Sequence, residues 1–449
     1  MPAKPKPGAS PRAFFVLGWG GTAIRPRRAS DRLGRCNVSV RACAMQVGDR
    51  SDSDAGSRLE RAERVLETVW GYGAFRPLQR RTVLAVLAGR DVLAVLPTGG
   101  GKSLCFQVPA LLLPGLTVVV SPLISLMQDQ VGALRRRGVP AAYLSSTQPA
   151  EVRRHVWDRV GQRRLKLLYV APERLASAST RLRGRVSLLA VDEAHCISEW
   201  GHEFRPQYRA IGRFRRALGG VRTVAVTASA TPETRADVVR SLGLRRPVTI
   251  LDSFDRANLR LAVQRAPSDG DRLVRTSTLL RAARGGSAIV YVPTRDRTDG
   301  TASILRAWGF RAVPYHAGLP GDDRRRLLGA FLRGEARVVV ATNAFGMGID
   351  KPDVRLVVHL GVPPRPEAYY QEAGRAGRDG APSDCVLLWQ PRDLTMALRL
   401  AGKGPAAEVG YAAMRRYVTR RVCRRRVLLG YLGERVPTPC GGCDVCLRV

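Results

Sequence analysis

The chain has 449 residues, and its 74 Lys and Arg against 37 Asp and Glu give a formal net charge of +37. A hydrophobic content of 45% and a charged content of 25% are typical of a folded soluble protein of two or three domains. No apolar run reaches the roughly 18 residues of a membrane span, so no membrane partner is expected. The nine cysteines lack the even spacing of a disulfide framework, which indicates a reducing compartment. The basic excess favours a nucleic-acid partner only modestly, because a GC-rich genome also enriches arginine.

The first 54 residues differ in composition from the rest of the chain. They mix Pro, Gly, Ala and Arg without a helical or strand period, and their first acidic residue is Asp31. Such a composition favours disorder, so we expect a disordered basic extension over residues 1–54. Two alternatives stay open: an Arg-rich transit peptide, and a translation start at Met45.

Order is expected to begin near Leu59, where apolar residues recur at the spacing of one helix face. Short β-branched runs then alternate with helical stretches. Mostly apolar strands separated by helices predict a parallel sheet covered on both faces, so residues 55–255 are interpreted as one α/β lobe. The expected strands are Asp91 to Leu96, Thr117 to Ser121, Leu167 to Ala171, Val186 to Val191 and Arg222 to Thr227.

The same alternation repeats farther along the chain and predicts a second α/β lobe over residues 256–392. The joint between the lobes is expected around Leu244 to Asp271, where periodicity is weak. Beyond Asp393 the pattern becomes helical and basic, which predicts a small third unit over residues 393–449. The strands expected in the second lobe are Ser287 to Val292, Arg311 to Tyr315, Ala336 to Ala341, Arg355 to Leu360 and Cys385 to Trp389.

A glycine-rich loop, Pro97-Thr98-Gly99-Gly100-Gly101-Lys102-Ser103, joins the first expected strand to a helix. Glycines let the backbone curl so that its N–H groups and the helix N-terminus face a phosphate. Lys102 then supplies a positive charge and Ser103 a Mg²⁺ ligand. Leu96 replaces the first glycine of the usual pattern, which is acceptable if that position still belongs to the strand. A glycine-rich turn that binds nothing rarely has this sequence, so the loop predicts nucleotide binding.

Two carboxylates, Asp192 and Glu193, follow the apolar strand Val186 to Val191 within the tetrapeptide DEAH. At the carboxyl edge of a strand, one carboxylate can hold Mg²⁺ while the other activates the attacking water, as phosphoryl transfer requires. The tetrapeptide alone is weak evidence. Its position after a hydrophobic strand and downstream of the phosphate loop makes it strong.

A pair of arginines, Arg375 and Arg378, lies in the segment Gln371 to Asp379 of the second lobe. Their spacing of three would place both on one face if the segment is helical. An arginine from a second lobe can reach the γ-phosphate only when the cleft closes, which would link hydrolysis to lobe movement. The alternative, a solvated basic helix end, is weakened by two glycines that allow close packing.

The order of these motifs resembles that of the superfamily 2 helicases, and the segments between them resemble the RecQ family of DNA helicases from about Leu66 to Cys446. The resemblance implies two tandem RecA-like lobes with ATP between them. Trp70 to Gln79 is similar to the family's adenine-reading motif, with Tyr72 stacked on the base. The implied ATP-binding residues are Tyr72, Arg76, Gln79, Thr98, Gly99, Gly100, Gly101, Lys102, Ser103 and Asp192, and the implied catalytic residues are Lys102, Asp192, Glu193, Arg375 and Arg378.

Directly after the DEAH box, Cys196 to Tyr208 is similar to the family's aromatic-rich loop. Aromatic and Arg side chains stack on bases with about 1 to 3 kcal/mol per base and without sequence preference. Because the loop adjoins the Mg²⁺ carboxylate, we expect it to couple strand occupancy to the ATP site. The coupling residues expected are Trp200, His202, Phe204 and Arg205.

Four cysteines, Cys423, Cys440, Cys443 and Cys446, form a C-x16-C-x2-C-x2-C pattern. Four thiolates suffice for a closed tetrahedral Zn²⁺ site. An iron–sulfur cluster and a redox pair are the alternatives, since C-x2-C-x2-C also occurs in ferredoxin-type ligation. The RecQ family has a structural zinc site with this spacing, so the resemblance favours Zn²⁺.

The resemblance implies an ATP-dependent DNA helicase of 3′ to 5′ polarity that acts in DNA repair or recombination. Its expected cofactors are ATP, Mg²⁺ and Zn²⁺, and its expected partners are single-stranded and tailed duplex DNA and accessory DNA-repair proteins. The expected location is the cytoplasm of a bacterium, at the nucleoid.

Many relatives continue into a winged-helix domain, whereas this sequence stops at Val449, three residues past Cys446. An alternative is therefore a DNA-stimulated translocase or remodeller that unwinds weakly. A catalytically silent nucleic-acid-binding protein is a third hypothesis, against which the intact Lys102, Asp192, Glu193, Arg375 and Arg378 argue. RNA unwinding is a further alternative, although the aromatic-rich loop and the zinc cysteines resemble the DNA family.

Overall fold

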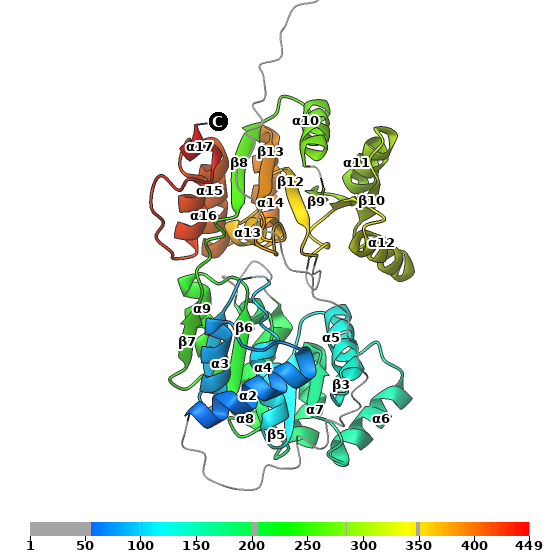
Figure 1. The fold of residues 1–449 in the computed structure, drawn as a ribbon, viewed down its shortest axis with the longest axis vertical. Helices are drawn as coiled ribbons and strands as arrows, with labels where there is room; N and C mark the ends of the chain where they lie inside the picture. The colour runs from blue at the N-terminus through cyan, green and yellow to red at the C-terminus, as the bar shows by residue number, and fades with distance from the viewer. Residues whose placement is uncertain (1–54, 98, 199–204, 284, 347–350, 449) are drawn as a thin grey trace, which may run out of the picture.

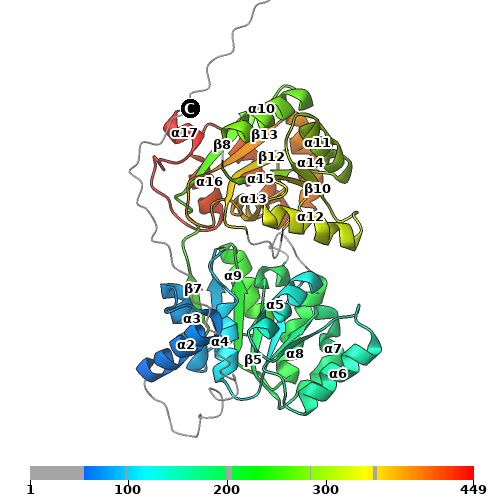
Figure 2. The same ribbon diagram turned by 45° about the vertical axis from the view of Figure 1, so that its right-hand side comes forward.

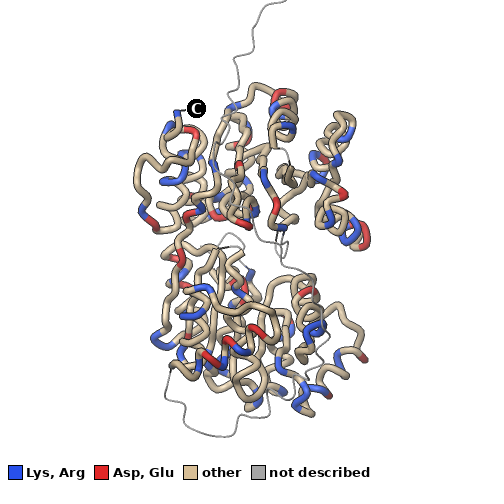
Figure 3. The backbone as a smooth tube through the Cα atoms, viewed as in Figure 1, with Lys and Arg blue, Asp and Glu red and all other residues tan. Residues whose placement is uncertain are grey.

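In the computed structural model, which describes residues 55–97, 99–198, 205–283, 285–346 and 351–448, two α/β lobes are stacked one above the other (Figure 1). A small helical unit lies beside the upper lobe, and the same arrangement is seen after a 45° turn (Figure 2). The expected N-terminal extension, residues 1–54, lies outside the described residues. Among the helices in the described ranges, none is both long and apolar enough to cross a membrane. Lys and Arg are spread along both lobes, with Asp and Glu interspersed (Figure 3).

The lower lobe is built on a seven-stranded parallel sheet of order β3-β4-β2-β5-β6-β1-β7. Successive residues of β1 belong to two different hydrophobic cores, because helices cover both faces of the sheet. The strands are β1 (Val92–Val95), β2 (Leu116–Val120), β3 (Ala141–Leu144), β4 (Leu167–Val170), β5 (Val186–Val191), β6 (Thr223–Thr227) and β7 (Val248–Leu251). The helices are α2 (Ala55–Trp70), α3 (Pro77–Leu87), α4 (Leu104–Leu112), α5 (Ile124–Arg136), α6 (Ala150–Gly161), α7 (Leu175–Leu182), α8 (Ala210–Ala217) and α9 (Pro232–Leu242).

The upper lobe has a six-stranded parallel sheet of order β10-β11-β9-β12-β13-β8. Its strands are β8 (Leu259–Arg265), β9 (Ser287–Tyr291), β10 (Ala312–Tyr315), β11 (Val338–Ala341), β12 (Val354–Leu360) and β13 (Ser383–Trp389). Its helices are α10 (Asp269–Ala282), α11 (Arg295–Ala307), α12 (Gly321–Arg333) and α13 (Pro366–Ala373). The helical unit contains α14 (Pro391–Ala401), α15 (Pro405–Thr419), α16 (Arg424–Tyr431) and α17 (Asp444–Leu447).

All ten strands expected from the sequence are present, with ends that differ by at most two residues. The joint between the lobes was expected over Leu244 to Asp271, and this prediction is wrong for most of these residues. The segment contains β7 and β8, which are edge strands of the first and second sheets and therefore carry fewer apolar residues than central strands. The connection between the lobes is confined to residues 252–258, called the linker below.

The helical unit covers the outer edge of β8. Leu261 N donates to Gly442 O at 3.0 Å, and Val263 N donates to Asp444 Oδ2 at 3.1 Å. Arg424 holds the same Asp444 carboxylate through Nε at 2.9 Å and Nη2 at 3.0 Å. The edge of the second sheet thus has hydrogen-bond partners from the C-terminal residues, which blocks strand addition there.

Asp91, directly before β1, connects three segments of the lower lobe. Its carboxylate accepts hydrogen bonds from Arg215 Nη2 at 2.7 Å, Thr223 N at 2.9 Å and Arg245 N at 2.7 Å. Asp91 and Arg215 are both buried. Removing one partner of such a pair leaves an uncompensated charge away from water.

We therefore expect Asp91→Ala to lower the free energy of unfolding by about 3 to 5 kcal/mol. Urea unfolding followed by tryptophan fluorescence measures the change. Arg260→Ala is the control, because Arg260 pairs with Asp384 on the surface and such pairs contribute at most about 1 kcal/mol. Similar losses in both variants would contradict the assigned role of Asp91.

Candidate functional site

Three neighbouring strands of the lower lobe, β5, β6 and β1, carry the predicted nucleotide residues to one edge of the sheet. The carboxyl ends of parallel strands meet at the same edge, where α/β proteins bind their ligands. The glycine-rich loop follows β1, the residues Asp192 and Glu193 follow β5, and Thr227 ends β6. The order of the strands therefore brings together motifs that are about 90 residues apart in the sequence.

The glycine-rich loop is tightly curled. Gly99 and Gly101 have φ angles of 82° and 66°, in the left-handed region that favours glycine. A Cβ atom on Gly101 would stand 2.3 Å from Gln79 Nε2, so only glycine fits there without movement of Gln79. Leu96 is buried and its N–H donates to Thr227 O at 3.0 Å, so this position continues the ladder of the strand as expected. Thr98 lies outside the described residues.

The residues predicted to read adenine lie against this loop. Arg76 Nη1 donates to Gly99 O at 2.8 Å, and Gln79 Nε2 donates to Gly100 O at 2.8 Å. Tyr72 is 57% exposed, which leaves its ring accessible for stacking. The structure thus places this motif at the rim of the loop, where Arg76 and Gln79 contact the backbone.

The two carboxylates differ in their surroundings. Glu193 adopts a left-handed backbone conformation with φ 45° and ψ 49°, and its N–H donates to Asp192 Oδ1 at 3.0 Å. Burial and the adjacent Glu193 carboxylate raise the pKa of Asp192 to about 7, and the Lys102 ammonium offsets them only partly. A buried carboxylate with a raised pKa beside a cation is typical of a functional site.

His195 of the same tetrapeptide links Glu193 to the neighbouring strand. Its Nδ1 lies 3.4 Å from Glu193 Oε2 and 2.8 Å from Thr227 Oγ1. Thr227 Oγ1 in turn donates to Ser229 O at 3.2 Å, and Gln371 of the upper lobe donates to Ser229 Oγ at 3.0 Å. Polar contacts therefore run from the carboxylate across to the second lobe.

The arginine segment of the upper lobe is not helical at the arginines. Helix α13 ends at Ala373, and Arg375 and Arg378 lie in the turns that follow, so the condition for a shared helix face is not met. Glycines at 374 and 377 end the helix. Arg375 is buried in its own lobe, whereas Arg378 faces Gly99: a Cβ atom on Gly99 would lie 3.7 Å from Arg378 Cγ.

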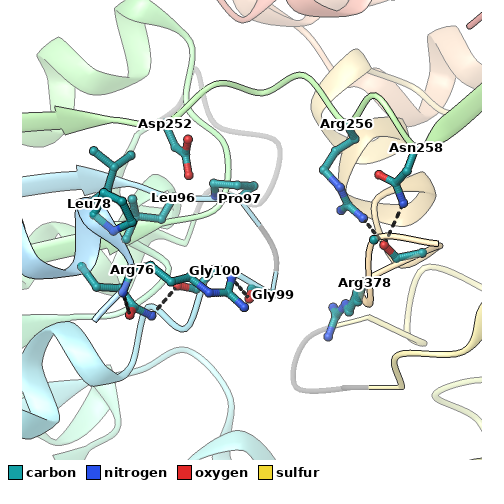
Figure 4. Close-up of a pocket in the computed structure, with 14 residues that line it drawn as sticks. Arg76, Leu78, Leu96, Pro97, Gly99, Gly100, Asp252, Arg256, Asn258 and Arg378 are labelled. Atoms are coloured by element: carbon teal, nitrogen blue, oxygen red, sulfur yellow. Dashed lines mark hydrogen bonds between the residues drawn. The ribbon is translucent and has the colours of Figure 1, made fainter. Parts of the chain in front are cut away.

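A pocket of about 430 Å³ lies between the lobes (Figure 4). One side is formed by Arg76, Gln79 and the glycine-rich loop, and the other by Arg378. Its volume and its cationic walls suit a nucleoside triphosphate. Sequence reasoning missed the contribution of the linker, whose Asp252, Arg256 and Asn258 also line the pocket. The only signal for them was a short polar stretch between two strands.

Of the predicted DNA-coupling residues, Trp200, His202 and Phe204 lie outside the described residues. Arg205 is described, and its Nη1 donates to Pro122 O at 2.8 Å. Tyr208, which closes the same segment, is buried and donates its hydroxyl proton to Asp192 O at 3.1 Å. The far end of the aromatic-rich segment thus contacts the carboxylate residue directly.

The four C-terminal cysteines converge. The Sγ atoms of Cys423, Cys440, Cys443 and Cys446 all lie within 4.8 Å of one another. Backbone N–H groups point at two of the sulfurs, from Arg426 to Cys423 Sγ at 3.5 Å and from Cys440 to Cys446 Sγ at 3.4 Å. Four sulfur donors at this spacing fit a tetrahedral Zn²⁺ ion.

The cysteines outside this cluster that the structure describes behave as apolar core residues. Cys105, Cys196 and Cys385 are buried. Burial raises the pKa of the Cys105 and Cys385 thiols to about 12, which keeps both protonated at neutral pH.

Replacing Asp192 with Asn is expected to stabilise the protein at pH 8 when Mg²⁺ and nucleotide are left out. The pKa of Asp192 is raised in the folded chain from 3.8 to about 7, so ionisation costs folded-state free energy that grows as pH rises through this window. At pH 8 the cost is on the order of 2 to 4 kcal/mol. Thermal unfolding should give a higher Tm for D192N than for the wild type, with a difference that shrinks toward pH 5. An equal difference at both pH values would argue against a buried, ionised Asp192.

Removing a cluster thiol is expected to abolish metal binding. Purified wild-type protein should contain about one Zn²⁺ per chain by elemental analysis, and Cys443→Ser should contain almost none and unfold at lower temperature. Cys385→Ala, at a buried thiol outside the cluster, should keep its zinc. Stoichiometric iron with visible absorption in the wild-type protein would overturn the zinc assignment.

Three family models match the chain. A DEAD/DEAH box helicase model covers residues 76–238, a helicase conserved C-terminal domain model covers residues 271–380, and a RecQ zinc-binding model covers residues 406–447. They correspond to the lower lobe, the upper lobe and the helical unit with its four cysteines. The last match supports Zn²⁺ at the cysteine cluster.

Known proteins match along most of the chain. The ATP-dependent DNA helicase RecQ of Haemophilus influenzae is 41% identical over 392 residues, which is 85% of this chain but 63% of that protein. This chain therefore spans less than two thirds of that relative's length. A helicase Lhr structure from Mycobacterium smegmatis, bound to single-stranded DNA and AMP-PNP, matches 81% of this chain and 53% of that one with TM-score 0.60 and 22% identity, which supports the fold alone.

The ATP-dependent DNA helicase RecQ of Bacillus subtilis is 41% identical over 402 residues, covering 86% of this chain and 67% of that protein. The two-lobed fold, the phosphate loop, the DEAH box and the cysteine cluster agree with this match. The chain belongs to the RecQ family of helicases.

Proposed function

We propose that the protein is an ATP-dependent DNA helicase that moves 3′ to 5′ along single-stranded DNA. The observation that carries the proposal is the pocket between the lobes, where Arg378 of the upper lobe faces the phosphate loop of the lower lobe. A site completed by two lobes is active only when they are together, which is what a motor needs. Membership of the RecQ family supports DNA as the substrate and suggests a role in DNA repair or recombination.

In the proposed reaction the lower lobe binds ATP and prepares the water. Lys102 and the N–H groups of the loop bind the phosphates, and Tyr72, Arg76 and Gln79 hold the adenine. Ser103 and Asp192 would hold Mg²⁺, which neutralises charge on the phosphate oxygens when bound. Glu193 orients and deprotonates the attacking water, and His195 keeps the Glu193 carboxylate in place through their 3.4 Å contact.

The upper lobe supplies the remaining positive charge. Arg378 already lines the pocket, and Arg375 lies three residues before it, buried in the upper lobe. Guanidinium groups placed on the γ-phosphate stabilise the charge of the transition state. The hydrogen bond from Gln371 to Ser229 joins the upper lobe to the strand end next to Glu193, which supports a coupling of hydrolysis to lobe movement.

The proposed DNA contacts lie on the aromatic-rich segment. Trp200, His202, Phe204 and Arg205 would stack on or contact bases of single-stranded or tailed duplex DNA. The hydrogen bond from Tyr208 to Asp192 supports communication between this segment and the ATP site. The family also suggests accessory repair proteins as partners and a location at the bacterial nucleoid.

The test is strand displacement on a duplex with a 3′ tail against one with a 5′ tail, with ATP turnover measured alongside. We expect unwinding of the 3′-tailed duplex only, and DNA-stimulated ATP turnover at least about a hundredfold lower in Lys102→Ala and Glu193→Gln. Both variants should still bind single-stranded DNA.

Retained turnover in either variant would refute the site assignment. Strong ATP turnover without displacement would show a translocase in place of a helicase. Preference for the 5′ tail would refute the polarity.

A further inference from the structure

The linker, residues 252–258, contacts the helical unit on one side and the arginine turns on the other. Its Phe254 is buried in a core that also contains Tyr370 of α13 and Leu429 of α16. Tyr370 donates its hydroxyl proton to Phe254 O at 2.8 Å, and the two rings meet edge to face at 5.9 Å. Three units of the molecule therefore meet at one linker residue.

The helical unit holds the first half of the linker. The Glu434 carboxylate accepts hydrogen bonds from Ser253 Oγ at 2.5 Å and from Phe254 N at 2.7 Å. Arg425, two residues after the metal-cluster Cys423, forms an ion pair with Asp255 and donates to Leu259 O at 2.6 Å. Side chains of the helical unit thus bind linker residues 253–255 and the first residue of β8.

The second half of the linker holds the arginine turns. Arg256 donates to three carbonyls, through Nη1 to Gly374 O at 3.2 Å and through Nη2 to Ala376 O at 3.0 Å and Gly377 O at 2.7 Å. These carbonyls flank Arg375 and Arg378. Asn258 Nδ2 adds bonds to Gly377 O and Ala381 O, both at 2.9 Å. Figure 4 shows Arg256 and Asn258 converging on this turn opposite the phosphate loop.

The carbonyls held by Arg256 follow the C-terminus of α13, where backbone acceptors lack helical partners. A planar guanidinium presents its N–H donors as a rigid fork that can bind several carbonyls at once. A lysine ammonium has no such planar set of donors and cannot reproduce this fork. Losing these bonds would free the turns that carry the two arginines, and a misplacement of about 1 Å at a reacting group can reduce a rate about a hundredfold.

We propose that Arg256 is a positioning residue for Arg375 and Arg378. We also propose that Glu434 fixes the linker that contains Arg256. Glu434 belongs to the helical unit, which also holds the four clustered cysteines and is called the zinc-binding unit below. The zinc-binding unit thereby helps to place the upper-lobe arginines at the ATP pocket. This inference rests on the proposed ATP hydrolysis. It adds a chain of contacts that connects the zinc-binding unit, through the linker and Arg256, to the arginine turns beside the nucleotide pocket.

The test compares Arg256→Gln, Arg256→Lys and Glu434→Ala in the full chain with zinc bound. DNA-stimulated kcat should fall about ten- to a hundredfold in both Arg256 variants and less in Glu434→Ala, with KM for ATP within about twofold of wild type. Affinity for ADP with aluminium fluoride, a mimic of the transferring phosphoryl group, should fall likewise, whereas affinity for ADP alone should not change.

Two matched variants serve as controls. Arg260→Gln removes an arginine that pairs with Asp384 on β13, and Glu408→Ala removes an exposed glutamate of α15 in the same helical unit. Both should keep the wild-type kcat. Glu434→Gln, which keeps the shape of the side chain, should fall between Glu434→Ala and wild type.

Each outcome decides between interpretations. Full activity in Arg256→Lys would show that the charge matters and the fork does not, which overturns the positioning role. Equal losses of ADP affinity, zinc content and thermal stability would show a general structural role and overturn it as well. Wild-type kcat in Glu434→Ala would remove the zinc-binding unit from the route. An inactive wild-type protein would instead refute the proposed hydrolysis, leaving the contacts of Arg256 as structural ones.

Discussion

Two carboxylates at the end of a buried strand impose the constraint on which the rest of the site depends. Asp192 is buried, the adjacent Glu193 is partly buried, and the two are alike in charge, so their repulsion must be offset by neighbouring groups. The lower lobe offers Lys102, the N–H of Glu193 and His195. These do not fully offset burial, because the pKa of Asp192 remains raised to about 7. A further cation beside Asp192, such as the Mg²⁺ of the proposed site, would be favourable.

The pocket between the lobes is not lined by the lower lobe alone. Arg378 comes instead from a separate sheet joined by a linker of seven residues, and its position depends on how the linker is held. A charged ligand bound between the lobes contacts both of them. It can therefore change the free-energy difference between the arrangement in which the lobes are together and the one in which they are apart.

The sequence was sufficient to predict elements whose signal is local. The central strands are β-branched and buried on both faces, and the phosphate loop and the cysteine cluster have fixed spacing, so they were found with few errors. The short linker between the lobes and the turns that carry Arg375 and Arg378 were not predicted correctly. β8 reads Leu-Arg-Leu-Ala-Val-Gln-Arg because it is an edge strand whose partner comes from Gly442 and Asp444, about 180 residues away. Helix α13 ends at Ala373, and the carbonyls of the turns that follow it are bound by the distant Arg256. Contacts of this kind have no local pattern.

The arginine excess also takes on a different meaning in the folded chain. Several arginines bind backbone carbonyls at helix ends. Arg256 does so after α13, Arg337 binds Leu280 O at 3.1 Å at the end of α10, and Arg424 binds Arg420 O at 2.9 Å after α15. Cations are favourable there because the last carbonyls are unpaired and the helix dipole is negative. Part of the charge of +37 thus serves the fold. The net charge alone therefore overstates the positive charge that is left on the surface for a polyanion such as the proposed DNA substrate.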